Sequence, residues 1–241
     1  MSFLDEKSTT FQMLGLTFDW PVVISTVIAA LLVFFLVFFL SRRLTMKPGK
    51  KQNVLEWMID FTNGIVDSSL PRSIGNELKL IAFTLFLFIL ISNEMGLAIQ
   101  VAFGDVTYVK SPTANPIVTM GLALLVIGLA NFVGVNKLGF KGYFKTTFLS
   151  PMPALLPINI FEQFTNYLTL ALRLYGNIMA GEMLLMLITN FGNPSHLGLT
   201  IVPAFILSMI WQAFSLFIGG IQAFIFVTLL SIYTSEHAIA E

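Results

Sequence analysis

Long apolar runs, separated by short polar segments, make up most of the chain. Residues 21–40 include no charged side chain and are almost entirely Val, Ile, Ala, Leu and Phe. The runs 80–103, in which Glu94 is the one charged residue, and 115–136 are of similar length. A helix needs about 20 mainly apolar residues to cross the hydrocarbon core of a bilayer. Each run is therefore predicted to form a transmembrane helix.

The last two apolar segments are longer than a bilayer requires. Residues 159–191 contain a few charged residues, and residues 183–235 contain no Asp, Glu, Lys or Arg. The residues 192–196 form the one evident turn between the two segments. A helix over 159–191 would be about 50 Å long, whereas the hydrocarbon core is about 30 Å thick. We therefore expect both helices to be strongly tilted.

Between the first two spans, polar and apolar positions follow a helical period. The polar residues, at steps of three and four, are Glu56, Asp60, Asn63 and Asp67. Apolar residues fill most of the other positions, which is typical of an amphipathic helix lying at the membrane interface.

These patterns predict an all-α polytopic membrane protein that forms a single integral membrane domain over residues 1–241. It should have about five transmembrane helices and one interfacial amphipathic helix. The expected segments are a transmembrane helix at 20–41, the amphipathic helix at 53–70, transmembrane helices at 78–103 and 115–137, and long tilted helices at 159–191 and 198–235.

Lys and Arg are concentrated on one side of these spans. Most flank the amphipathic helix or follow the third span, whereas Lys7 and Lys110 lie on the other side. Because cytoplasmic loops are enriched in basic residues, we expect the N-terminus outside and the C-terminus in the cytoplasm. The first residues lack the basic region of a signal peptide, so the first helix is expected to be retained. An odd number of spans without a repeated motif argues against an inverted-repeat transporter.

Composition agrees with a membrane protein. Hydrophobic residues make up 56% and charged residues 11% of the chain, and the mean hydropathy is +0.84. Soluble domains have roughly 25% charged residues. Lys and Arg total 13, as do Asp and Glu, so nothing indicates a nucleic-acid surface. With no Cys, two His and no phosphate-binding loop, we expect no metal site, no cofactor and no catalytic residue.

Arg173 lies within a predicted span, where its charge costs about 3 kcal/mol on insertion scales. Its guanidinium stays protonated at any working pH. An intramembrane charge of this kind indicates an ion pathway. The alternative is a structural ion pair with Glu162, Glu182 or a neighbouring chain. Neither acid has the three- or four-residue spacing that makes a local partner for Arg173.

Helical spacing groups the polar residues of the last two segments. The fourth span has one stripe of Asn166, Thr169, Arg173 and Asn177. Glu162 lies about three turns before Arg173 on nearly the same face, and Glu182 lies on the opposite face. A hydrogen-bonded or protonated core carboxyl is the alternative for each acid. On the last helix, Ser208, Ser215 and Gln222 form a second stripe that could face the first or could serve as interhelical contacts alone.

The segment from Leu172 to Glu182, with its sequence LRLYGNIMAGE, and the segment Gln222 to Phe226 resemble subunit a of the F-type ATP synthases of bacteria. The number of spans and the amphipathic helix extend the resemblance over the whole chain. It implies a non-catalytic, proton-translocating subunit of the bacterial plasma membrane that acts in ATP synthesis. The implied partners are the ring of c subunits, the b subunits of the peripheral stalk, the remaining complex and the lipid bilayer. H⁺ is favoured over Na⁺ as the transported ion.

The resemblance also implies roles for individual residues. Arg173 matches an essential Arg that separates two half-channels and faces the ring carboxylates. Glu182 matches the acid of the outer half-channel, Gln222 matches a Gln near the Arg, and Asn177 a polar residue of that region. Ser215 stands where some relatives have His, so water held by Ser215 and Glu182 is expected to replace the imidazole.

Two further residues are assigned by geometry. Glu162 and Glu56 are expected on the cytoplasmic route, although Glu56 fits equally well on the solvated face of an interfacial helix. The runner-up function is a secondary transporter with an anionic-substrate site at Arg173. A structural membrane anchor would leave the energetic cost of Arg173 unexplained.

Overall fold

A computed structural model describes residues 10–13, 16–42, 45–47, 49–98, 101–103, 106–109, 111–149, 152–192 and 201–238. Of the expected turn at 192–196, residues 193–196 lie outside these ranges, and Gly192 is the C-terminal cap of the helix that precedes it. Lys7 and Lys110, on which part of the predicted orientation rests, also lie outside these ranges.

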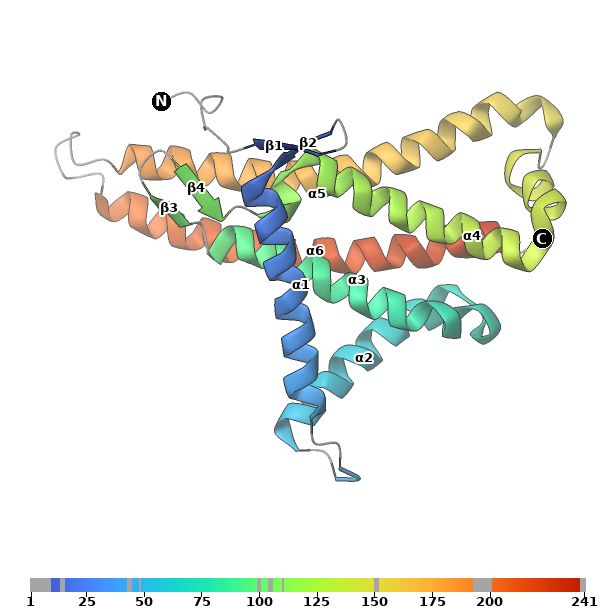
Figure 1. Cartoon of the computed structure of the whole chain (residues 1–241), viewed down its shortest axis with the longest axis horizontal. Helices are drawn as coiled ribbons and strands as arrows, with labels where there is room; N and C mark the ends of the chain where they lie inside the picture. The colour runs from blue at the N-terminus through green and yellow to red at the C-terminus, as the bar shows by residue number, and fades with distance from the viewer. Residues whose placement is uncertain are drawn as a thin grey trace.

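Six α-helices form most of the described structure (Figure 1). They are α1 (Trp20–Ser41), α2 (Lys50–Ser69), α3 (Arg72–Ala98), α4 (Pro116–Phe148), α5 (Leu156–Phe191) and α6 (Ile201–Ala238). Among the described residues, five of the helices, all except α2, are long and apolar enough to cross a membrane. The predicted all-α polytopic class is therefore confirmed.

Two short antiparallel hairpins were not predicted. The first pairs β1 (Thr10–Met13) with β2 (Leu16–Asp19), and the second pairs β3 (Val101–Phe103) with β4 (Val106–Val109). Helix α3 ends at Ala98, five residues before the expected end of the helix 78–103. Strand β3 occupies the last three of these positions, Val101–Phe103. Val, Thr and Phe favour strands, so the apolar end of this run is compatible with either structure. Single-turn 3₁₀ helices, η1 (Pro112–Ala114) and η2 (Pro153–Leu155), precede α4 and α5.

The start of α4 and a break within it follow from local chemistry. The Asn115 side chain accepts a hydrogen bond of 2.8 Å from the Ile117 backbone N–H, and Pro116 occupies the first turn. Gly139, with φ 71° and ψ 160°, interrupts the helix close to the expected end at residue 137. Past this point the helical tail reaches the end of α6, where the Tyr143 and His237 rings lie 5.8 Å apart.

Helix α6 lies at the centre of the packing. Its apolar residues Ala223, Phe226, Val227 and Leu230 are completely buried, and α6 contacts α2, α3, α4 and α5. Figure 1 shows α5 and α6 side by side, running across the direction of α1. Helix α1 is the most apolar of the candidate spans and the least buried, so we take its axis as the direction of the membrane normal. Relative to this direction, α5 and α6 are strongly tilted, as their length predicts.

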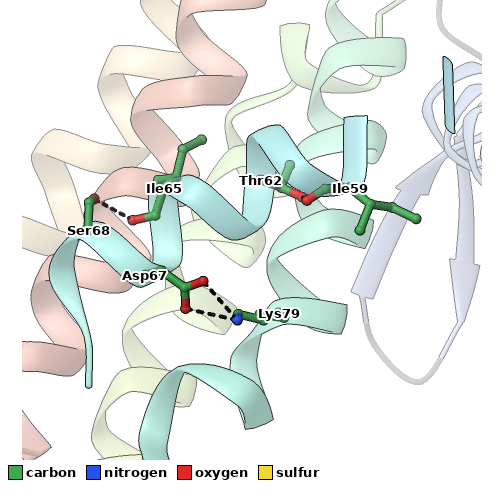
Figure 2. Close-up of polar contacts among 6 residues, drawn as sticks. All are labelled: Ile59, Thr62, Ile65, Asp67, Ser68 and Lys79. Carbon is green, nitrogen blue, oxygen red and sulfur yellow. Dashed lines mark hydrogen bonds and ion pairs between the residues drawn. The ribbon is translucent and has the colours of Figure 1, made fainter. Parts of the chain in front are cut away.

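Helix α2 is amphipathic, as its pattern predicts. Leu55, Ile65 and Val66 are buried in the core, whereas Glu56 and Asp67 are exposed. Figure 2 shows how its polar groups are satisfied: the Thr62 and Ser68 hydroxyls donate to backbone carbonyls of α2 itself. Lys79 of α3 binds both carboxylate oxygens of Asp67, at 2.8 and 2.9 Å. This pair links α2 to α3 near the turn between them.

Candidate functional site

Two interhelical hydrogen bonds fix the register of the antiparallel helices α5 and α6. The Asn177 side-chain amide donates to the Gln222 carbonyl oxygen at 2.9 Å. The Trp211 indole N–H donates to the Gly181 backbone carbonyl at 3.2 Å. This register brings the two polar stripes of the sequence together at Asn177 and Gln222.

A cavity of about 150 Å³ lies at this contact. Asn93 of α3, Asn177 of α5, and Ser215 and Gln222 of α6 supply its polar lining. A single water molecule needs about 10–15 Å³ of such space and two to four polar partners. The cavity is therefore large enough and polar enough to hold several hydrogen-bonded waters.

Helix α3 contributes a polar network that sequence reasoning missed. The Asn93 amide donates to the Gly219 carbonyl of α6 at 3.2 Å, and the Asn93 oxygen accepts from the Thr113 hydroxyl at 2.9 Å. Ser111 lies 2.8 Å from Thr113 and donates to the Ser92 carbonyl at 3.0 Å. The available signal was the polar triplet Ser92, Asn93 and Glu94 inside an otherwise apolar span.

Arg173 lies on α5, partly exposed and one helical turn before Asn177. It makes no ion pair with any other described residue, so the alternative of a pair with Glu162 or Glu182 is not formed within this part of the chain. The Tyr233 hydroxyl of α6 lies within electrostatic reach of Arg173.

Glu182 and Ser215 are both buried, on α5 and α6 respectively. Glu182 follows Asn177 by five residues, and Ser215 precedes Gln222 by seven. In the observed register the two residues therefore lie at a similar level along the helix pair. Ser215 lines the cavity, as does Gly181, the residue before Glu182.

Glu162 lies near the other end of the helix pair. It is exposed on α5, and its charge acts on Glu236 and Tyr233 of α6. Glu236 and Tyr233 continue the stripe of Ser208, Ser215 and Gln222 by helical spacing, but the sequence analysis ended that stripe at Gln222 and so did not include them. Arg173 lies along α5 between this acidic group and the cavity.

Glu56 lies on α2, which contributes no residue to the lining of the cavity. It is exposed on α2 and accepts a hydrogen bond from the Gln52 amide at 2.8 Å. It does not line the cavity between α3, α5 and α6.

The described residues offer no group of three or more His, Cys, Asp or Glu side chains that could hold a metal ion. What this arrangement provides is a polar cavity large enough for water, an acidic region, and a fixed cation between them along α5. Such groups can exchange and guide protons without forming or breaking other bonds.

Comparison with known proteins gives matches over nearly the whole chain. The family model described as ATP synthase A chain matches residues 23–235. The ATP synthase subunit a of Enterococcus hirae is 53% identical over 235 residues, which cover 97% of this chain and 98% of that protein. That of Pediococcus pentosaceus is 51% identical over 231 residues, covering 96% and 97%. That of Listeria monocytogenes is 41% identical over 234 residues, covering 97% and 98%.

Proposed function

This chain belongs to the ATP synthase A chain family, and from that premise we propose that it is the proton-translocating stator subunit of the F-type membrane motor. In this role it offers two offset half-channels to the carboxylates of a rotating c ring. It performs no catalysis of its own and couples proton flow to the rotation that drives ATP synthesis.

The observation that carries this proposal is Arg173, which is partly exposed on an open face of α5 and forms no ion pair with any residue that the structure describes. A Cβ added at Gly176, one turn later, would meet no atom within 4 Å. Asn177 and Ala180 on the same helix are also exposed. Small residues allow helices to approach closely. This surface therefore fits a partner helix carrying a carboxylate that the fixed charge of Arg173 would stabilise in its ionised form.

The cavity supports an outer half-channel. With the N-terminus outside, the end of α3, the second half of α5 and the first half of α6 all lie toward the outer side. The cavity there is lined by Asn177, Ser215 and Gln222, and Glu182 lies at a similar level on α5. Water between these residues would carry protons toward the ring. Ser215 holds water at the place where an imidazole would act in some relatives.

The acidic group supports an inner half-channel. The start of α5 and the end of α6 lie toward the cytoplasm in this orientation. Glu162, together with Glu236 and Tyr233, forms the inner polar region, and Glu56 on α2 is assigned to its cytoplasmic approach. Arg173 blocks direct proton transfer between the regions because a proton entering its vicinity meets a permanent positive charge.

The same proposal includes the partner subunits, the membrane and the transported ion. The c ring covers the open face of α5 and α6, and the b subunits of the peripheral stalk bind elsewhere in the complex. The subunit lies in the bacterial plasma membrane, with its C-terminus in the cytoplasm, and transports H⁺ rather than Na⁺.

The test is proton pumping in inverted membrane vesicles that carry the complete complex with Arg173→Ala or Arg173→Lys. We expect both variants to lose coupled ATP-driven pumping while the complex still co-purifies. Arg72→Ala, an exposed cation at the start of α3, is the matched control and should pump normally. Pumping near the parental rate in an assembled Arg173→Ala complex would contradict the proposal.

A further inference from the structure

Glu94 of α3 is an acid with no role in the site described so far. Its Oε1 atom is buried and has no hydrogen-bond partner among the described residues. A buried polar atom without a partner is destabilising, and in a transmembrane helix an ionisable residue is a functional candidate by default. Glu94 therefore needs a physical explanation.

The carboxyl group of Glu94 lies against the backbone of α6 at the cavity. A Cβ added at Gly219 would be 2.9 Å from Glu94 Oε1 and 3.3 Å from the Cβ of Asn93. Gly219 and Asn93 both line the cavity, and they are joined by the hydrogen bond from the Asn93 amide to the Gly219 carbonyl. Glu94 is thus in contact with the lining of the cavity, without being part of the lining itself.

A second unsatisfied group lies nearby. Gln222 Nε2 is buried without a hydrogen-bond partner among the described residues, although Gln222 Oε1 accepts from Asn177. Gln222 lies one helical turn after Gly219 and also lines the cavity. Gln222 Nε2 is a hydrogen-bond donor and Glu94 Oε1 is an acceptor, and both are close to Gly219. Water in a polar cavity would supply the missing partner to each of them.

We propose that Glu94 is a further proton-exchanging residue of the route through this cavity, binding and releasing protons with the water held between α3, α5 and α6. The exchange moves one proton: an O–H bond of hydronium breaks, a carboxyl O–H bond forms at Glu94, and neutral water remains. Release reverses these changes. The inference rests on the proposed function, because it adds a residue from α3 to the outer half-channel.

The variant Glu94→Gln tests it, because the amide keeps nearly the shape of the carboxyl group but cannot exchange protons. Passive proton flow and ATP-driven pumping are measured in vesicles containing the intact complex. We expect both rates to fall several-fold while the complex remains assembled. Glu77→Gln is the matched control, since Glu77 is exposed on the same helix and pairs with Lys137 at 3.0 Å, away from the cavity. It should conduct at the parental rate.

The variant Glu94→Asp provides a second test if Glu94→Gln prevents the complex from assembling. It retains an exchangeable carboxyl group on a shorter side chain. We expect it to conduct faster than Glu94→Gln and to shift the pH dependence of passive proton flow. Parental flow in an assembled Glu94→Gln complex would overturn the proposal. So would a Glu94→Asp complex with a parental rate and an unchanged pH profile.

Arg173→Ala, measured in the same series, separates the two proposals. If Arg173→Ala stops coupled pumping while Glu94→Gln leaves proton flow unchanged, the inference about Glu94 fails and the proposed function stands. If an assembled Arg173→Ala complex still pumps, the proposed function itself fails.

Discussion

Single polar side chains join α6 to a different neighbouring helix on each of its two sides. The Gln222 carbonyl oxygen pairs with Asn177 of α5, whereas the Gly219 carbonyl accepts from Asn93 of α3. Interhelical hydrogen bonds in membranes contribute about 0.6 kcal/mol on average. Bonds of this strength position side chains around the cavity, while the buried apolar residues of α6 supply most of the packing.

Gly219→Ala should displace the Glu94 carboxyl group and crowd the Asn93 side chain. The added Cβ would lie 2.9 Å from Glu94 Oε1 and 3.3 Å from the Asn93 Cβ, so the helices or the Glu94 side chain must move. We expect less assembled complex and several-fold slower pumping per complex, measured by co-purification and by vesicle acidification. Gly220→Ala is the control because its nearest neighbour, Leu90 Cδ1, is 4.0 Å away. Equal behaviour of the two variants would show that close approach at Gly219 is unimportant.

The boundaries of whole helices depend on contacts that lie outside the helix itself. Helix α4 breaks at Gly139 yet continues to Phe148, and this tail brings Tyr143 and Thr147 to His237 at the end of α6. The apolar pattern alone ends near residue 137, since Lys137, Lys141 and Lys145 follow. The tail is helical because α6 offers it a surface to pack against.

Gly139→Ala tests this break. At φ 71° and ψ 160°, Gly139 occupies a backbone region that is essentially restricted to glycine. An alanine held in this conformation should destabilise the folded protein by about 1–3 kcal/mol of backbone strain. We expect the temperature at which membrane-embedded complexes lose pumping to fall. Gly128→Ala, in the regular part of α4 with no atom within 4 Å, should leave that temperature unchanged or raise it slightly. A Gly139→Ala complex as heat-resistant as the parent would argue against strain at this position.

At the scale of the molecule, the arrangement of α5 and α6 across α1 determines which residues meet (Figure 1). Because the two long helices are antiparallel, the second half of α5 contacts the first half of α6. The cavity forms there, and the acidic group at Glu162 and Glu236 forms near the opposite end. A strongly tilted helix pair can in this way hold two separate polar regions within one membrane.

Absence of cysteine makes the orientation directly measurable. We expect Met46→Cys, in the exposed segment before α2, to react with a membrane-impermeant maleimide from the cytoplasmic side. Ile201→Cys, exposed at the start of α6, should react from the outer side. The labels are compared in right-side-out and inverted vesicles after confirming pumping. Labelling of both positions from the same side would contradict the five-span topology.

Several features followed from the sequence because they depend on local order along one helix. Apolar runs predicted the all-α membrane class, and three- and four-residue spacing placed Asn177 and Arg173 on one stripe. These predictions need nothing more than helix geometry and the cost of charge in lipid. The roles assigned to Arg173, Glu182, Ser215 and the other site residues remain predictions for the experiments above.

The tertiary structure decided what each polar residue meets. Sequence spacing left open whether Ser215 and Gln222 face the stripe of α5, and the register of the helix pair joins Gln222 to Asn177. It also brings Asn93 and Glu94 of α3 to Gly219, far along the chain. Periodicity describes one helix at a time, whereas register and crossing between helices depend on how all their surfaces pack together.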